Sequence, residues 1–338
     1  MKSEGISNIW AIRHGIIFGI VSLTVLLPVV LGKQGTTAHY LILLLMLLPF
    51  FGIPHGALDY PLAKRLLFDR FGNTWALWFV TAYMLCIIAV VAAWMLFPTL
   101  SLVVFLALSL YHFGTGDATA ICTSPTVVKV TEFVSRGGIV LTFPAAFDSR
   151  EVQVLFSYLV PESNAVKIIA VLTELTPLVA ACFIICTLTS VYEFLRRKKT
   201  LDLLRAFELL SLGSLFTLLP ALLSFTVYFS FLHSVRHMLK VASDGTTVSM
   251  IQGLLGAFRK SLPVTVATIV LGSVVYFWDG KLALDISKTV QIVFIGIASM
   301  TYPHVLVIAL AARSQTVMNA IGTKTGILFA PQPTDSKA

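Results

Sequence analysis

Long apolar runs alternate with short polar segments along almost the whole chain. A helix needs about 20 consecutive apolar residues to cross the hydrocarbon core of a membrane. Ten runs come close to that length: 15–32, 38–60, 74–96, 99–120, 127–147, 166–195, 203–219, 221–242, 262–278 and 289–312. The pattern therefore predicts an all-α, polytopic membrane bundle of about ten spanning helices.

Two of these runs are weaker than the others, so the pattern also allows eight or nine spans. The run 127–147 contains Glu132 and Arg136, and the run 203–219 is short and ends before Pro220. Charged residues inside a span are costly for the membrane-inserted chain. We expect eight to ten helices.

Some segments lie outside the predicted spans. Residues 248–260 place apolar side chains at helical spacing beside two basic residues, which is typical of a helix lying at the lipid headgroups. Residues 148–165 fit a strand or a helix, and both interpretations stay open. We expect a single helical domain over 1–320 and a disordered tail over 321–338, which is polar and contains proline.

The composition supports a membrane protein. Of the 338 residues, 57% are hydrophobic and only 12% are charged, and the mean hydropathy is +0.90. A soluble domain carries about 25% charged residues, so this chain has too little polar surface to face water. The formal net charge of +8 lies mostly in short loops between apolar runs, which favours a topology signal over nucleic-acid binding.

Basic residues predict the orientation of the chain. Arg196, Arg197, Lys198 and Lys199 stand together and are followed by Arg205. Such clusters remain on the cytoplasmic side of a membrane. Counting outward through ten helices places the other basic loops and both termini on that same side. We expect a multi-pass protein of the cell membrane with a cytoplasmic N-terminus and C-terminus.

Histidines provide the candidate chemistry. Two of the seven, His14 and His39, fall near predicted helix ends, where a polar ring meets water, so we expect them at the interface. The other five lie within or at the end of apolar helices, where ionisable residues are costly and usually mark function. These five are His55, His112, His233, His237 and His304.

The predicted topology places the five histidines in one layer. The four helices that carry them run in the same direction, and the histidines lie about 12 to 17 residues from the helix starts, a narrow range of depth at 1.5 Å per residue. His233 and His237 are four residues apart, so both rings face the same side of a helix. Ligands of one ion must be close together in this way. We predict a metal site, with an interhelical hydrogen-bonded pair as the alternative.

Neutral imidazole suits zinc, copper, iron or nickel. Asp59 lies four residues after His55, and Asp117 lies five after His112, so both are candidates for outer partners that orient the ligands. Each is equally well explained as a polar residue at a helix end. Glu174 lies in the span 166–195, and the sequence does not decide its role.

Aromatic residues are abundant near these histidines. Lipid contact or core packing explains any one of them. Together they support the hypothesis of a hydrophobic tunnel for a long conjugated substrate. The candidates are Phe51, Tyr111, Phe113, Tyr228, Phe229 and Tyr302.

Four motifs occur in order along the chain: GIPHGALD, YHFGTGD, FLHSVRH and YPHV. The set resembles the family of bacteriorhodopsin-related proteins and their homologues, the membrane β-carotene 15,15′-dioxygenases. The resemblance covers residues 38–312, and each motif alone is weak. It implies a catalytic helical membrane domain and an iron-dependent enzyme.

The resemblance also implies the parts of the site. By motif, the ligands of Fe(II) would be His55, His112, His233 and His237, with His304 nearby and not assigned a bond to iron. The enzyme would cleave the central double bond of β-carotene with O2 and release two molecules of all-trans-retinal. Retinal would then serve a microbial rhodopsin.

Other functions remain to be weighed against this one. A di-iron membrane desaturase or hydroxylase has about eight histidine ligands, more than the five available here. A haem protein needs axial histidines on facing helices, which an absorbance spectrum would reveal. A transporter or proton channel also uses intramembrane histidines and carboxylates. No internal repeat of the kind that transporters have is visible in the sequence.

Overall fold

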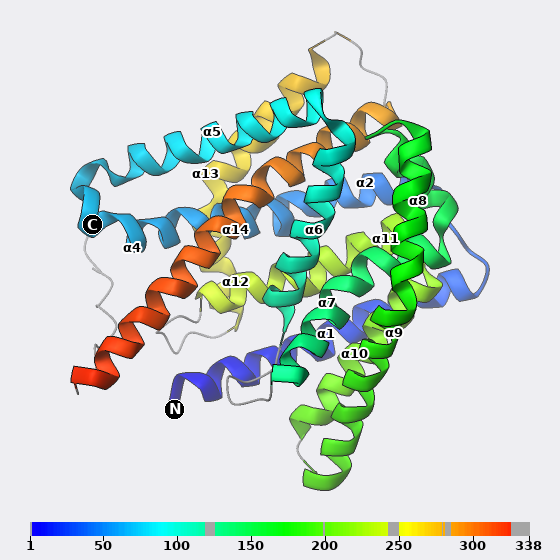
Figure 1. The fold of residues 1–338 in the computed structure, drawn as a ribbon, viewed down its shortest axis with the longest axis horizontal. Coiled ribbons are helices and arrows are strands. Elements are labelled where there is room, and N and C mark those ends of the chain that lie inside the picture. The colour runs from blue at the N-terminus through cyan, green and yellow to red at the C-terminus, as the bar shows by residue number, and fades with distance from the viewer. Residues whose placement is uncertain are drawn as a thin grey trace.

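The computed structural model describes residues 2–118, 126–198, 200–242, 250–278, 280 and 285–325. These described parts contain helices and no strand, as Figure 1 shows. The predicted all-α membrane class is confirmed.

The helices follow one another with short connections. In chain order they are α1 (Lys2–Val30), α2 (Thr37–Leu47), η1 (Leu48–Gly52), α3 (Ile53–Ala57), α4 (Asp59–Phe71), η2 (Gly72–Thr74), α5 (Trp75–Leu96), α6 (Pro98–Asp117), α7 (Thr126–Phe147), α8 (Ser149–Ser157), α9 (Glu162–Arg197), α10 (Thr200–Leu218), α11 (Ala221–Val227), η3 (Tyr228–Ser234), α12 (Val235–Ala242), α13 (Met250–Phe277) and α14 (Ile286–Thr325).

Local sequence explains several boundaries. Pro98 begins α6, where its missing N–H leaves no hydrogen bond unmade. Gly72 ends α4 with a φ of 52°, a positive value that glycine adopts without strain. The chain then turns back, so that α5 packs against α4 on the left of Figure 1.

Five stretches of described helix are long and apolar enough to cross a membrane. They are Thr37–Leu96, which combines α2 to α5, Pro98–Asp117, Glu162–Arg197, Ile251–Phe277 and Ile286–Ser314. The remaining predicted spans are helical but shorter or less apolar: His14–Val30 of α1, α7, α10 and the run from α11 to α12. The count of ten spans stays a prediction.

The charged residues that weakened the predicted span 127–147 face the interior of the bundle. Helix α7 packs against α6, α9 and α10, at the centre of Figure 1. Arg136 of α7 is 1% exposed and forms ion pairs with Glu132 and with Glu208 of α10. Polar groups inside a membrane protein are tolerated when they pair with one another in this way.

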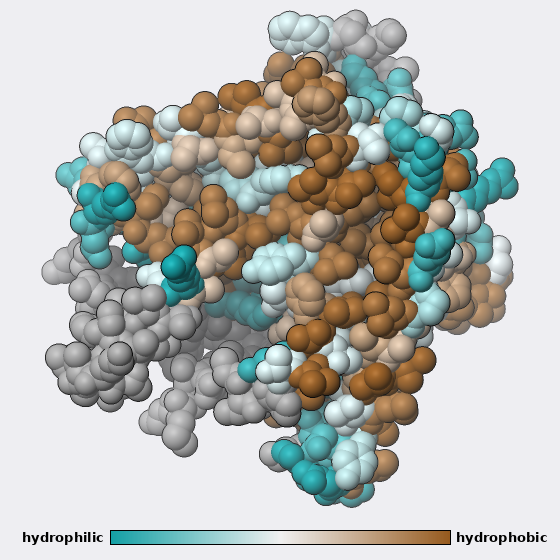
Figure 2. Space-filling model, viewed as in Figure 1, coloured by the Kyte–Doolittle hydropathy of each residue, from teal (hydrophilic) through white to brown (hydrophobic). Residues whose placement is uncertain are grey.

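The surface is apolar across its middle. In Figure 2 hydrophobic residues cover the centre of the visible face, and hydrophilic residues gather at its margins, including the tip where α9 meets α10. That tip carries Arg196 and Arg197, part of the basic cluster that orients the chain in our prediction. The distribution fits a belt of lipid around the bundle.

The structure describes all or part of the three segments that we expected outside the spans. Residues 149–157 form helix α8, so the helical interpretation of 148–165 is correct for that part. Residues 250–260 do not form a separate surface helix, because α13 continues without a break into the next span. The helix α14 extends to Thr325, and the rest of the predicted tail lies outside the described residues.

Two turns of π-helix interrupt the α-helices, and the sequence analysis did not predict them. They are η1 and η3, in which each main-chain hydrogen bond spans five residues instead of the four of an α-helix. Pro54 follows η1 and has no N–H to donate to the carbonyl of Phe50, so the regular α-helical pattern is interrupted there. Turns of this kind are common at functional sites.

Candidate metal centre

Five histidine rings meet inside the bundle. His55, from α3, lies at the centre, with ring-centroid distances of 4.2 Å to His237, 4.6 Å to His304, 4.8 Å to His233 and 5.7 Å to His112. His237 is partly exposed and the other four are buried. The helices α3, α6, η3, α12 and α14 therefore deliver their histidines to one place.

Three of these rings present nitrogens to a common point. One nitrogen from each of His55, His112 and His304 lies within 4.8 Å of the other two. His304 is thus as close to the centre as two of the ligands inferred from the motifs. The sequence placed it near the site without assigning it a bond.

Asp59 holds His304. Its Oδ1 lies 2.8 Å from Nδ1 of His304, and its Oδ2 accepts a hydrogen bond of 3.0 Å from the hydroxyl of Tyr83 on α5. A carboxylate only accepts, so Nδ1 of the neutral His304 ring carries the proton and Nε2 presents a lone pair. That Nε2 is buried and has no hydrogen-bond partner among the described residues.

Asp117 holds His233 in a similar way. Its Oδ2 lies 3.3 Å from Nδ1 of His233 and accepts a hydrogen bond of 2.6 Å from the hydroxyl of Tyr228. The Nε2 of His233 then faces Nε2 of His112 at 2.9 Å. Both carboxylates contact histidines of the cluster, but neither contacts the histidine that precedes it in the sequence.

The donor set fits a metal ion. Nδ1 of His55 and Nε2 of His304 are both buried without a hydrogen-bond partner in the described part of the chain. An unpaired buried polar atom costs about 1–3 kcal/mol. An ion among these nitrogens would remove that cost, and iron is among the metals that neutral imidazole suits.

A network of charges lies behind Asp117. Arg136 donates to Glu132 at 2.9 Å and to Glu208 at 2.6 Å, and Arg236 of α12 also donates to Glu208. The other terminal nitrogen of the Arg236 guanidinium, Nη1, donates to the main-chain carbonyl of Asp117 at 3.1 Å. The end of α6 is thus hydrogen-bonded to α12, the helix that carries His237, through an arginine that is itself held in a buried ion pair.

Close packing at glycines brings the helices together. A Cβ at Gly137 would lie 2.2 Å from the carbonyl oxygen of Leu110, so α6 and α7 approach at a distance that only glycine permits. A Cβ at Gly116 would lie 3.2 Å from Cε1 of His233. These contacts place the end of α6, with His112 and Asp117, against η3.

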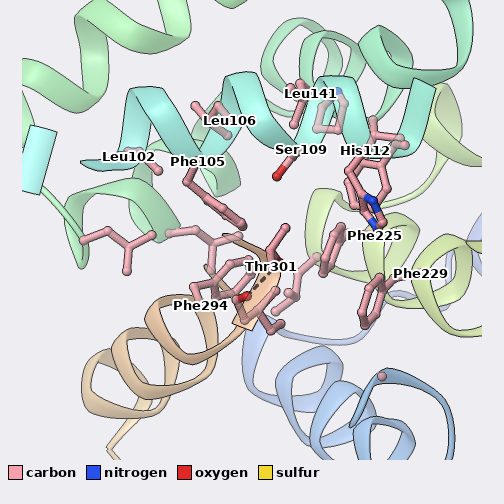
Figure 3. Close-up of a pocket in the computed structure, with 18 of the residues that line it drawn as sticks. Leu102, Phe105, Leu106, Ser109, His112, Leu141, Phe225, Phe229, Phe294 and Thr301 are labelled. Atoms are coloured by element: carbon pink, nitrogen blue, oxygen red, sulfur yellow. Dashed lines mark hydrogen bonds between the residues drawn. The ribbon is translucent and has the colours of Figure 1, made fainter. Parts of the chain in front are cut away.

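An apolar cavity of about 160 Å³ opens beside the histidines. His55, His112 and His304 line one end of it. From there it follows α6 to Leu102, ten residues before His112, which corresponds to about 15 Å along a helix. Figure 3 shows the lining residues Leu102, Phe105, Leu106, Ser109, His112, Leu141, Phe225, Phe229, Phe294 and Thr301.

The six aromatic candidates divide into two groups. Phe113 and Phe229 line the cavity. The other four do not belong to its lining. Tyr228 is buried and bonds Asp117, Phe51 packs on Phe231 with ring centroids 5.2 Å apart, Tyr111 is 46% exposed, and Tyr302 is partly exposed.

The structure also shows the surroundings of His14, His39 and Glu174, the three other polar residues considered from the sequence. His14 is 2% exposed, and its Nε2 lies 2.6 Å from the carbonyl oxygen of Phe231, so the predicted interfacial position is wrong: α1 packs along α10 and η3 and covers the ring. His39 is exposed and bonds Thr36, as expected at a helix start. Glu174 is exposed on α9 and does not join the histidines.

Comparison with known proteins identifies the family. The family model described as β-carotene 15,15′-dioxygenase matches residues 14–311. The chain belongs to this family. The predicted family membership is therefore confirmed, and with it the prediction that the chain is a dioxygenase.

Two relatives show the extent of the similarity. A protein of an uncultured marine bacterium, 66A03, named β-carotene 15,15′-dioxygenase, is 29% identical over 264 residues, which cover 78% of this chain and 91% of the relative. A protein of Halobacterium salinarum, named probable β-carotene 15,15′-dioxygenase Blh, is 26% identical over 328 residues, 90% of this chain and 94% of the relative. No solved structure matches the chain.

Proposed function

We propose that this dioxygenase uses iron to cleave the central 15,15′ double bond of β-carotene with O2. The observation that supports this most directly is the apolar cavity that ends at His55, His112 and His304. A cavity lined mostly by hydrocarbon side chains suits a hydrocarbon substrate, and the metal-binding groups at its end are imidazoles.

The proposed ligands of Fe(II) are His55, His112, His233 and His237, taken from the motifs. Bound Fe(II) with an open position would supply the binding and activation of O2 beside the polyene. One oxygen atom would enter each product, so that one β-carotene and one O2 give two molecules of retinal.

The protein's own residues contribute positioning and exclusion of water. Phe229 from η3 and Phe113 from α6 offer flat rings next to the histidines, against which a polyene can stack. Leu102, Phe105 and Leu106 continue the apolar surface along α6. Holding the substrate in one orientation is itself a large part of catalysis.

The substrate dissolves in the bilayer, so we propose entry from the lipid between helices, in a protein of the cell membrane with both termini in the cytoplasm. The retinal formed would supply a microbial rhodopsin. Neither step requires an acid or base group of the protein.

Expression in cells that make β-carotene tests the proposal. We expect the orange colour to disappear and retinal to accumulate, while cells with the matched variant His112→Ala keep their carotenoid. Unchanged carotenoid with the natural sequence, at a confirmed level of membrane-inserted protein, would contradict the proposed activity.

A further inference from the structure

The place of His304 in the site goes beyond what the motifs imply. Its ring comes from α14, close to the C-terminal end of the matched region, and it is 3% exposed. Its centroid lies 4.6 Å from His55, 5.0 Å from His112 and 5.1 Å from His237. It is therefore in contact with three of the four proposed ligands.

The hydrogen bonds of His304 direct its free nitrogen toward that centre. Nδ1 donates to Asp59 at 2.8 Å, which fixes the tautomer and leaves the lone pair on Nε2. Nε2 is buried with no hydrogen-bond partner among the described residues. A purely structural histidine would leave this atom unsatisfied at a cost of about 1–3 kcal/mol, whereas a ligand would use it.

Asp59 is itself fixed. Its second oxygen accepts from Tyr83 on α5 at 3.0 Å, and the residue is 2% exposed. A carboxylate that accepts from the far nitrogen of a metal-bound histidine orients the ring and raises its basicity. The hydrogen bonds from Tyr83 to Asp59 and from His304 to Asp59 have this arrangement, and they join α5, α4 and α14 at the site.

Charge supports the same conclusion. Neutral imidazoles leave the two positive charges of Fe(II) uncompensated, and a buried uncompensated charge is strongly unfavourable. Asp117 lies behind His233, and Asp59 lies behind His304. If both rings bind the ion, two carboxylates stand one imidazole away from it.

We propose that His304 is a further ligand of the iron, and that Asp59 and Tyr83 are positioning residues that act through it. The inference rests on the iron site of the proposed function, and it changes the ligand set that the motifs imply. Asp59 contributes through His304 alone, so its effect must disappear when His304 is absent.

The test measures Fe(II) binding by purified, metal-free protein without oxygen, by competition with a chelator and by iron content per chain. We expect Asp59→Asn to weaken Fe(II) binding about 10- to 100-fold and His304→Ala to weaken it at least as much. The double variant should bind no more weakly than His304→Ala. If His304→Ala binds Fe(II) as the natural sequence does, or if the two losses multiply, the inference is wrong.

A second variant separates the ligand from a structural role. His304→Asn keeps a donor near the position of Nδ1 for Asp59 but has no atom equivalent to Nε2. We expect it to fold and to retain weakened Fe(II) binding. Full recovery of Fe(II) affinity in His304→Asn would show a structural role and overturn the proposal.

The matched control removes the charge of another carboxylate that is partly buried, that of Glu151. Glu151 of α8 bonds Thr37 at 2.8 Å and the N–H of Leu222 at 3.1 Å, away from the histidines. Glu151→Gln should leave Fe(II) affinity unchanged. If the natural sequence itself binds no Fe(II), the iron-dependent function fails together with this inference; if it binds Fe(II) and His304→Asn binds equally well, only the inference fails.

Discussion

Two carboxylates flank the histidine cluster, and their surroundings differ. Asp59 and Asp117 each accept from one tyrosine hydroxyl and each contact Nδ1 of one histidine. Behind Asp117 stands the ion-pair network that reaches Arg236, and its tyrosine, Tyr228, is 1% exposed. Behind Asp59 stands Tyr83, which is only partly buried.

The difference separates two tasks. On the Asp117 side the groups that orient a histidine are one carboxylate and one hydroxyl, and beside them Arg136, Glu208 and Arg236 join α6, α7, α10 and α12. On the Asp59 side the carboxylate and the hydroxyl join α4, α5 and α14 without an ion-pair network beside them among the described residues. We therefore expect changes on the Asp117 side to lower both stability and metal binding, and changes on the Asp59 side to lower metal binding more than stability.

The largest effect on iron binding should come from His55, which contacts the histidine held by Asp59 and the histidine held by Asp117. His55 contacts His304 and His233 and lies at the centre of the five rings. We expect His55→Ala to abolish iron binding and retinal formation, measured as iron per chain and as product by chromatography. Wild-type iron content in this variant would show that the cluster is not centred on His55.

The next largest effect should appear on the Asp117 side. Breaking a buried ion pair by removing one partner costs about 3–5 kcal/mol, because the remaining charge is left unpaired. We expect Arg236→Ala to lower the thermal unfolding temperature of the detergent-solubilised protein by less than that full cost implies, since Glu208 keeps Arg136 as a partner while the carbonyl of Asp117 loses its donor. An unchanged unfolding temperature would remove the structural role of the network.

A matched pair of substitutions compares the two sides directly. Asp117→Asn and Asp59→Asn should each weaken Fe(II) binding about 10- to 100-fold, because each removes the carboxylate behind a histidine. Asp117→Asn should also lower the unfolding temperature of the metal-free protein by more than Asp59→Asn does, because the charge of Asp117 lies beside the buried Arg236. Equal unfolding temperatures for the two variants would erase the distinction drawn above.

The smallest effect should come from the hydroxyl of Tyr83. Tyr83→Phe removes one hydrogen bond to a carboxylate that keeps its histidine, a loss of about 1.5–3 kcal/mol at most for a bond to a charged group. We expect weaker Fe(II) binding than in the natural sequence but stronger than in Asp59→Asn. Binding weaker than in Asp59→Asn would mean that Tyr83 acts by another route.

Much of the site could be predicted from apolar periodicity. The predicted topology placed five histidines of four helices in one layer, and the structure places their rings in contact: His55, His112, His233, His237 and His304. This worked because long apolar helices in a membrane have few possible arrangements, so position along a helix converts into depth.

The partners of the carboxylates could not be predicted from spacing. The helix breaks at Leu58, so Asp59 begins α4 and turns away from His55 toward α14. Asp117 is five residues after His112, which places the two on different faces of α6. Contacts between helices decide both pairings, and such contacts leave no mark in the local sequence.

Two other features could not be predicted from the sequence, for related reasons. The π-helical turns η1 and η3 change the register of the side chains that follow, and only Pro54 hinted at the first. His14 looked interfacial because it is close to the start of an apolar run, whereas packing of α1 on α10 and η3 buries it. The helix α1 begins at Lys2, well before the apolar run, so His14 lies inside a helix and not at its end.

The central claim is iron-dependent cleavage of β-carotene at its central bond, and one measurement tests it most directly. Purified protein is stripped of metal, titrated with Fe(II) without oxygen and then given β-carotene and O2. We predict no product without iron, and with iron two molecules of retinal for each β-carotene consumed and no aldehyde of another length. Retinal formed at the same rate without iron, or products of unequal length, would contradict the account.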